Sequence, residues 1–122
     1  MLHHLSIAVT DLQRSAAFYD ATLAALGYRR VCANDWFIGY GLVDDCDKFA
    51  LKLIPDGVTI PGEGTHVAFT APTRQAVDEF YRAALKHGGS DNGGYGLHPE
   101  YGPNYYAAFV FDPDGYRIEA AI

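Results

Sequence analysis

The side chains in this sequence that could do chemistry near neutral pH are few and widely spaced. Five histidines are present, and two of them, His4 and His66, each open a short stretch in which apolar and small residues alternate. Imidazole gains and loses protons near neutral pH, and its neutral form is a common metal ligand. A third alternating stretch, near residue 122, carries the carboxylate of Glu119. Whether these groups act together depends on the elements that position them.

Cysteine usage and charge limit the class of protein. Cys32 and Cys46 lie in no Cys-x-x-Cys motif and no Cys/His cluster, which favours two reduced thiols in a reducing compartment. The first residues lack the basic and apolar regions of a signal peptide, and no stretch has the roughly 20 apolar residues of a membrane helix. The net charge is −6 and the nine basic residues are scattered. We therefore expect a cytoplasmic protein with no nucleic-acid partner and no membrane association.

The two halves of the sequence are similar to each other. Residues 4–27 and 66–89 align without a gap at a constant offset of 62 positions. The identities are His4 with His66, Phe18-Tyr19 with Phe80-Tyr81, Ala21 with Ala83, Leu23 with Leu85, and Gly27 with Gly89. This shared register indicates a duplicated supersecondary unit.

Each copy reads as one strand, one helix and three further strands. The period-two stretches after His4 and His66 predict strands with large apolar residues on the helix-facing side. Thr10 or Asp11 caps a helix that stops at Gly27, and a second helix runs from about Thr73 to residues 88–89. Further strands are predicted at 28–33, 36–40, 49–54, 105–111 and 116–122, and the glycine-rich stretch 88–96 as a loop. Residues 112–115, Asp-Pro-Asp-Gly, predict the turn of a hairpin.

These elements predict an α+β fold in one domain, residues 1–122. Two βαβββ repeats, about 1–57 and 62–122, would form a curved, mainly antiparallel sheet with the helices on its outer face. The edges of such an open sheet are usually covered, and two-fold symmetry is the commonest way to do so. We therefore expect a homodimer.

Several segments resemble the vicinal oxygen chelate superfamily, which includes glyoxalase I, bleomycin and fosfomycin resistance proteins and extradiol dioxygenases. They are the opening His4-Leu5 with Val9 and Asp11-Leu12, the Phe18-Tyr19 pair, GTHVAF at 64–69 and FDPDGYRIE at 111–119. The stretch YGPNYYAAF at 101–109 is similar to a glyoxalase-like branch of that superfamily. The resemblance covers essentially the whole chain and implies the same fold, but one fold hosts many reactions.

The resemblance also implies a metal site, because this family places ligands on the first and last strand of each repeat. The matching positions here are His4, His66 and Glu119. Two imidazoles and a carboxylate suit Fe, Mn or Zn, and Ni is a further candidate. Aligning 49–53 with 116–120 puts Lys52 where a glyoxalase would have a fourth ligand, a carboxylate. Lys52 would then repel a metal ion, hold an anionic substrate, or pair with Glu119 in a metal-free site.

Other side chains are candidates for substrate contact or catalysis. His98 and Tyr101 lie in a loop that would hang over the concave face, with Glu119 as a further catalytic group. If Tyr105, Ala107 and Phe109 face the helix, Tyr106 points into the cavity. Trp36 and Tyr40 occupy the matching region of the first repeat and would line an apolar pocket, although aromatic strand residues are often simply core.

Two functions remain open on this evidence. The first is a metal-dependent enzyme, a lyase, isomerase or ring-cleaving dioxygenase, acting on a small molecule with adjacent oxygens. It depends on His4, His66 and Glu119. The alternative is a metal-free protein of the bleomycin-resistance type that binds or sequesters a small molecule, which depends on Lys52 and the aromatic residues.

Overall fold

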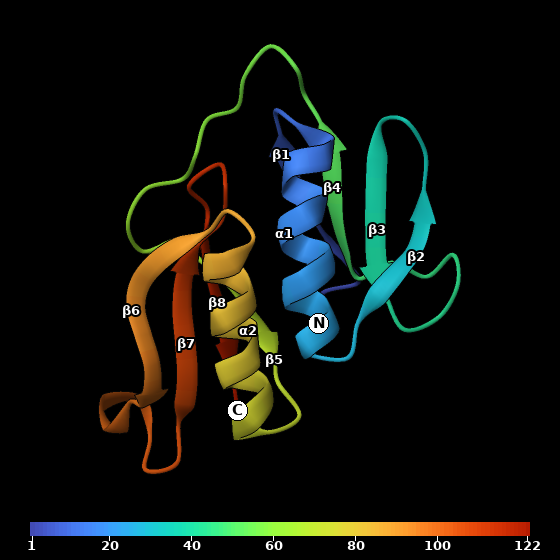
Figure 1. Ribbon diagram of the computed structural model, residues 1–122. Helices are drawn as coiled ribbons and strands as arrows, with labels where there is room; N and C mark the ends of the chain where they lie inside the picture. The colour runs from blue at the N-terminus through green and yellow to red at the C-terminus, as the bar shows by residue number, and fades with distance from the viewer.

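The computed structural model describes residues 1–122, and its element order repeats βαβββ twice (Figure 1). The first half contains β1 (Leu5–Val9), α1 (Leu12–Ala25), β2 (Arg29–Ala33), β3 (Phe37–Gly41) and β4 (Phe49–Leu53). The second contains β5 (Val67–Thr70), α2 (Arg74–Lys86), β6 (Ser90–Leu97), a short 3-10 helix η1 (Pro99–Tyr101), β7 (Tyr106–Phe111) and β8 (Arg117–Ala121). The predicted α+β class and tandem repeat are confirmed.

The strands form two four-stranded sheets, with orders β1-β4-β3-β2 and β5-β8-β7-β6. In each sheet the first and last strands of the unit pair in parallel, and the other neighbours are antiparallel. The helices α1 and α2 pack against each other, each on its own sheet, and a long connection joins β4 to β5 (Figure 1). Neither helix is long and apolar enough to cross a membrane.

Both helices begin at a capping side chain and end at a glycine. Asp11 accepts a hydrogen bond from the backbone N–H of Arg14, so it is Asp11 rather than Thr10 that caps α1. Thr73 accepts from the N–H of Ala76 in the same way. Just past the two helix ends, Gly27 and Gly88 have φ values of 93° and 97°, where a side chain would be strained.

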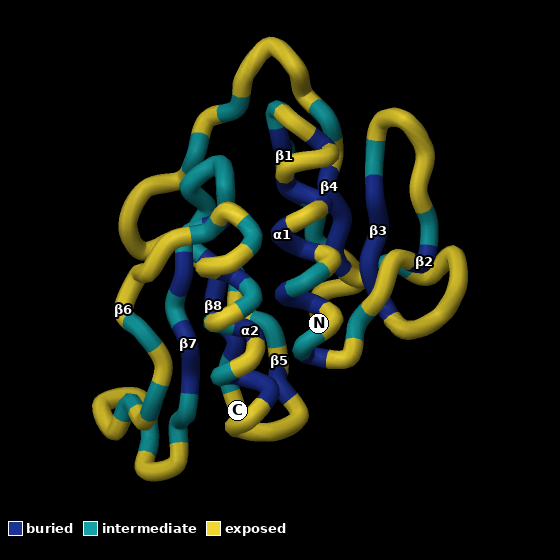
Figure 2. Tube along the Cα trace, in the orientation of Figure 1, coloured by how far each residue is buried: buried dark blue, intermediate teal, exposed yellow.

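One hydrophobic core joins the halves beneath the two helices, shown as the dark blue segments of Figure 2. The repeated pair Phe18 and Phe80 is fully buried, and the rings of Phe49 and Phe69 meet edge to face at 5.0 Å between centroids. The buried Tyr19 hydroxyl donates to Asp112 Oδ2 at 2.6 Å. Burial raises the pKa of Tyr19 and also that of Asp112, so this bond favours the protonated phenol.

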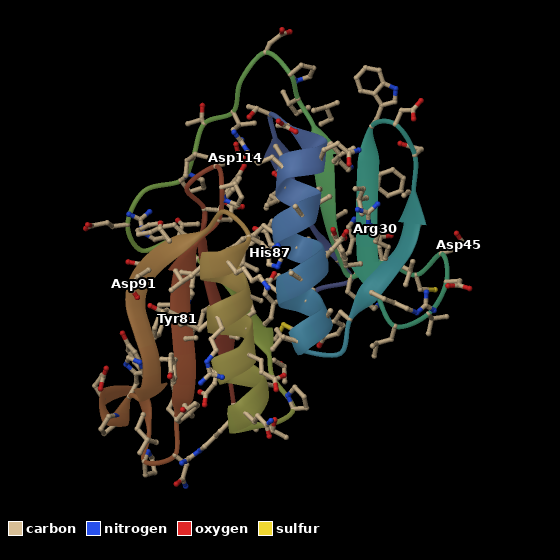
Figure 3. All side chains as sticks on the ribbon, viewed as in Figure 1. Arg30, Asp45, Tyr81, His87, Asp91 and Asp114 are labelled. Atoms are coloured by element: carbon tan, nitrogen blue, oxygen red, sulfur yellow. The ribbon has the colours of Figure 1, made fainter.

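The glycine-rich stretch is a strand, so its prediction as a loop is wrong. Ser90–Leu97 pairs with β7 throughout except for a bulge between Asp91 and Gly94. Asp91 Oδ1 accepts hydrogen bonds from the N–H groups of Gly93 and Gly94 and from the Tyr81 hydroxyl of α2, which points toward it in Figure 3. Pairing with β7 and this bulge outweigh the low strand propensity of glycine.

Candidate functional site

His66 and Glu119 meet on the face of the second sheet that points away from α2. The parallel register of β5 and β8 places Ala68 opposite Glu119, and His66 lies two residues before Ala68 on the same face. His66 Nε2 is 3.1 Å from Glu119 Oε2, and the Glu119 side chain is only 3% exposed against 51% for His66. A buried carboxylate is therefore held next to an accessible imidazole.

Tyr105 completes the surroundings of this carboxylate. Its hydroxyl donates to Glu119 Oε1 at 2.6 Å. That hydrogen bond, with burial and the nearby negative charge, raises the pKa of Tyr105 to about 12. Each oxygen of Glu119 thus has a partner from its own chain, which offsets the cost of burying the group.

The pair opens into a cavity of about 390 Å³, which lies within the size range of small-molecule sites. Strands β6, β7 and β8, the segment that leads into β5 and the β6–β7 connection form its walls. The lining residues are Gly64, Thr65, His66, Asn92, Tyr101, Tyr105, Phe109, Arg117, Ile118 and Glu119.

Tyr106 faces α2 and not the cavity, so the predicted facing of this strand is wrong. Its hydroxyl donates to Asp78 Oδ1 of α2 at 2.7 Å, and the Arg74 guanidinium lies 5.0 Å from its ring. Tyr105 and Phe109 line the cavity instead. The strand carries Ala107 and Ala108 on opposite faces, both fully buried, so alternation gave no signal for which face is which. Tyr105 was missed for this reason.

His4 does not join His66 and Glu119 within one chain. It lies before β1, in the other sheet, with its Nδ1 2.8 Å from that of His3. It lines a separate cavity with Ser6, Phe37, Asp47, Ala50 and Lys52. No group of three or more His, Cys, Asp or Glu side chains is arranged to hold a metal ion. Within one chain, His4 therefore does not join the other two expected ligands, because β1 and β5 belong to different sheets.

The strand register also corrects the alignment of Lys52 with Glu119. Glu119 pairs with Ala68, which repeats Ser6, and Ser6 pairs with Ala50. Ala50 is therefore the counterpart of Glu119, and Lys52, which pairs with Ala8, is the counterpart of Ala121. Glu119 bonds to His66 and Tyr105, not to Lys52. The first half thus has alanine where a fourth ligand would lie.

The remaining aromatic candidates are divided between the site and other places. Tyr101 lines the cavity, its ring 5.5 Å from that of Tyr105. His98 packs behind it, 4.9 Å from the Phe109 ring, with its Nδ1 3.0 Å from Glu100. Tyr40 is buried against α1, where its hydroxyl donates to Asp20 at 2.8 Å, and burial raises its pKa. Trp36 is exposed in the β2–β3 connection. Neither Tyr40 nor Trp36 lines the Glu119 cavity.

The donor pair in the second half suits two positions around a divalent cation. Two ligand atoms about 2.1 Å from one ion, at about 90° to each other, lie about 3 Å apart. The observed separation of Glu119 Oε2 and His66 Nε2 is 3.1 Å. One imidazole and one carboxylate are ligand types that Fe, Mn, Ni and Zn all accept. One chain supplies this pair but not a third ligand beside it.

Residues 1–120 match the Glyoxalase/Bleomycin resistance protein/Dioxygenase superfamily. The chain therefore belongs to that superfamily, which agrees with its repeated βαβββ fold. No curated protein matches the chain.

Solved structures show the same fold. A glyoxalase/bleomycin resistance protein from Albidiferax ferrireducens superposes with a TM-score of 0.83 at 29% identity, over 97% of this chain and 95% of the other. A glyoxalase-related enzyme from Fulvimarina pelagi gives 0.75 at 22% identity, over 99% and 86%. A glyoxalase I variant from Zea mays gives 0.68 at 24% identity, over 97% of this chain and 44% of the maize chain. The last two, at this identity, support the fold alone.

Proposed function

We propose that the protein is a metal-dependent enzyme that acts on a small molecule with adjacent oxygen atoms, bound in the Glu119 cavity. The observation that carries this proposal is the buried Glu119 carboxylate, 3.1 Å from an accessible imidazole at the wall of a cavity of about 390 Å³. Burying a carboxylate costs free energy, and here the carboxylate is buried beside a cavity large enough for a small molecule. Whether the chemistry is that of a lyase, an isomerase or a dioxygenase depends on the substrate.

His66 and Glu119 would hold the cation, and His4 of a second copy would supply the third ligand. His4 is exposed and has no acidic partner, so a neighbouring chain has access to it. A homodimer that places the His4 face of one copy over the Glu119 face of the other would bring the three types of ligand together. A bound divalent cation would act as a Lewis acid on the two substrate oxygens.

The other residues of the cavity would orient the carboxylate and the substrate. Tyr105 keeps its proton up to about pH 12, so at neutral pH its hydroxyl donates to Glu119 and fixes the carboxylate plane. Tyr101, exposed at the mouth, would cover a bound substrate and exclude water. His98, stacked behind Tyr101, would hold that ring in position.

The metal-free alternative loses its main support, because Lys52 does not reach Glu119. A metal-dependent enzyme and a metal-free binding protein differ in one measurable property, the uptake of a divalent cation. Untagged protein, freed of metal with a chelator, should take up Mn(II), Fe(II), Ni(II) or Zn(II) and melt at a higher temperature. Glu119→Gln should abolish both effects, whereas Lys52→Gln should leave them intact. Absence of uptake, or equal uptake by Glu119→Gln, would reject the proposal.

A further inference from the structure

Arg117 lines the cavity, and none of the salt bridges in the chain involves its guanidinium. Its Nη1 donates to the carbonyl oxygen of Pro61 at 3.2 Å, and its guanidinium lies 5.5 Å from the Phe111 ring. Arg14, Arg29 and Arg30 each pair with an aspartate instead. A guanidinium has five N–H donors, so most of those on Arg117 remain free to bind an anion.

The opposite end of the cavity is aromatic. Along the β7–β8 ladder, Arg117 lies opposite Phe111 and Glu119 lies opposite Phe109. Tyr105 immediately precedes β7, at the end of the ladder away from Arg117. Tyr101 packs against Tyr105 at that end. On β6, the positions opposite Phe109 and Ala107 are Gly94 and Gly96, and nothing lies within 4 Å of a side chain built at either. A flat ring therefore meets aromatic walls there, with no β6 side chain opposite Phe109 or Ala107.

The His66–Glu119 pair lies between these two ends. Residues two apart on one strand face are about 6.8 Å apart, so Arg117 is one such step from Glu119. An anion is repelled by the Glu119 carboxylate, whose two oxygens are already occupied. An anionic group in this cavity is therefore directed to Arg117, and the rest of the ligand extends past Glu119 toward Tyr101.

We propose that the cavity binds an aromatic monocarboxylate. Its carboxylate pairs with Arg117, its ring lies against Tyr101, Tyr105 and Phe109, and a short chain between the two passes the His66–Glu119 pair. This inference rests on the proposed function, because the same cavity is taken as the substrate site. A doubly charged phosphate is disfavoured, since Arg117 is the one arginine or lysine lining the cavity and a buried carboxylate lies beside it.

The test uses the full chain without metal, titrated with small probes and followed by NMR chemical shifts. The probe 3-phenylpropanoate should bind at least about tenfold more tightly than the neutral 3-phenylpropanamide, because the amide loses a charge-assisted bond to Arg117. It should also bind more tightly than 3-cyclohexylpropanoate and 3-phenylpropyl phosphate. Equal affinity for the acid and its amide would overturn the inference, and so would the absence of any shift at Arg117 or Tyr105.

Variants then test whether Arg117 is the residue that binds the carboxylate of the probe. Arg117→Gln should weaken 3-phenylpropanoate binding about tenfold, Arg117→Lys should weaken it less, and Tyr101→Ala should also weaken it. Arg29→Gln is the matched control, because it removes the same charge from the first half. Equal loss in Arg29→Gln and Arg117→Gln would show that net charge alone is responsible and would overturn the inference. The acid–amide comparison in the unaltered protein stands even if a variant fails to fold. Since no metal is present, failed metal uptake and failed probe binding are separate results.

Discussion

The two halves share one fold, and each has a cavity on its sheet, but only the second places a buried carboxylate at the cavity wall. Phe109 in the second half lies opposite Glu119, and the corresponding pair in the first half is Gly39 opposite Ala50. A buried carboxylate and an aromatic ring are thus matched by two of the smallest residues. The repeat kept the residues that build the fold, whereas the residues on the sheet face differ between the halves.

The connection between the last two strands explains much of this difference. In the first half it spans 42–48 and folds back over the sheet, and a side chain at Gly39 would meet Asp47 and Cys32 Sγ at 2.6 Å. In the second half it is the short turn 112–116, which leaves the face of β7 and β8 open. A residue without a side chain is therefore required at Gly39, where the loop lies against the sheet. The same framework thus gives a cavity of about 290 Å³ beside the loop residue Asp47 in the first half and one of about 390 Å³ beside Glu119 in the second.

The largest effects should be equal in the two halves, because the fold is what they share. Phe18 and Phe80 are matched by the repeat and both are fully buried. Phe18→Ala and Phe80→Ala should each lower the free energy of unfolding by about 3–5 kcal/mol, from lost burial and the cavity left behind. Urea unfolding measures both. A loss below about 1 kcal/mol in one half alone would mean that the halves do not share one core.

A carboxylate placed on the first face should not reproduce the second. Ala50→Glu puts an acid at the counterpart of Glu119, where the residue is 1% exposed and no tyrosine corresponding to Tyr105 is available. We expect a loss of about 2–3 kcal/mol, from burying a carboxylate without a tyrosine hydroxyl to donate to it. Ala50→Ser is the milder control. Recovery of the full stability of Ala50→Glu on adding Ni(II) or Zn(II) would show that the first half can also form a metal site, and would contradict this prediction.

Removing the Tyr105 hydroxyl should have a smaller effect with a distinctive pH dependence. Tyr105→Phe should cost about 1 kcal/mol at neutral pH through the lost bond to Glu119. The folded-state pKa of Tyr105, about 12, exceeds its ordinary value of 10.0, so the stabilisation is complete below pH 10 and is lost as pH rises toward 12. Wild type and variant should therefore converge in urea unfolding between pH 10 and 12. Tyr101→Phe, whose hydroxyl makes no hydrogen bond within the chain, should show no such convergence.

The smallest effect should come from Lys52→Glu. Lys52 is exposed and matches Ala121, not Glu119. The melting temperature should shift by no more than the equivalent of about 0.5 kcal/mol, with or without added metal. A clear gain in metal affinity would restore the alignment of Lys52 with Glu119 and refute the register argument.

The sequence predicted the framework well because the framework depends on local and repeated signals. The offset between His4 and His66, the helix starts at Thr10 or Asp11 and near Thr73, and the stops after each helix all follow from residue type and spacing. The glycine-rich β6 could not be predicted, because its pairing with β7 depends on contacts distant in sequence. Its bulge is held by Asp91 through backbone donors that no periodicity reveals.

The site was predicted only in part, for a related reason. His66 and Glu119 were found because the family resemblance assigns ligands to the first and last strand of a repeat, and the structure joins them. Tyr105 was assigned to the wrong face, because Ala107 and Ala108 are alike and do not indicate which face of the strand meets the helix. The alignment of Lys52 with Glu119 was wrong by two residues. A shift of two residues keeps every side chain on the same face of the strand, so the apolar pattern could not reveal the error. His4 was expected in the same site because sequence alone does not show that the halves form separate sheets.

The most direct test of the account mixes two variants that each lack one part of the proposed metal site. His4→Asn removes the ligand of the first half, and Glu119→Gln removes the carboxylate of the second, so each variant alone should bind little metal. Unfolded together in equal amounts and refolded, they form mixed dimers that contain one intact site. Metal capacity measured by equilibrium dialysis should then return to about one quarter of the wild-type value, since half of the dimers are mixed and one of their two sites is whole. No recovery in the mixture, with wild type taking up metal under the same conditions, would contradict a site shared between the two halves of different copies.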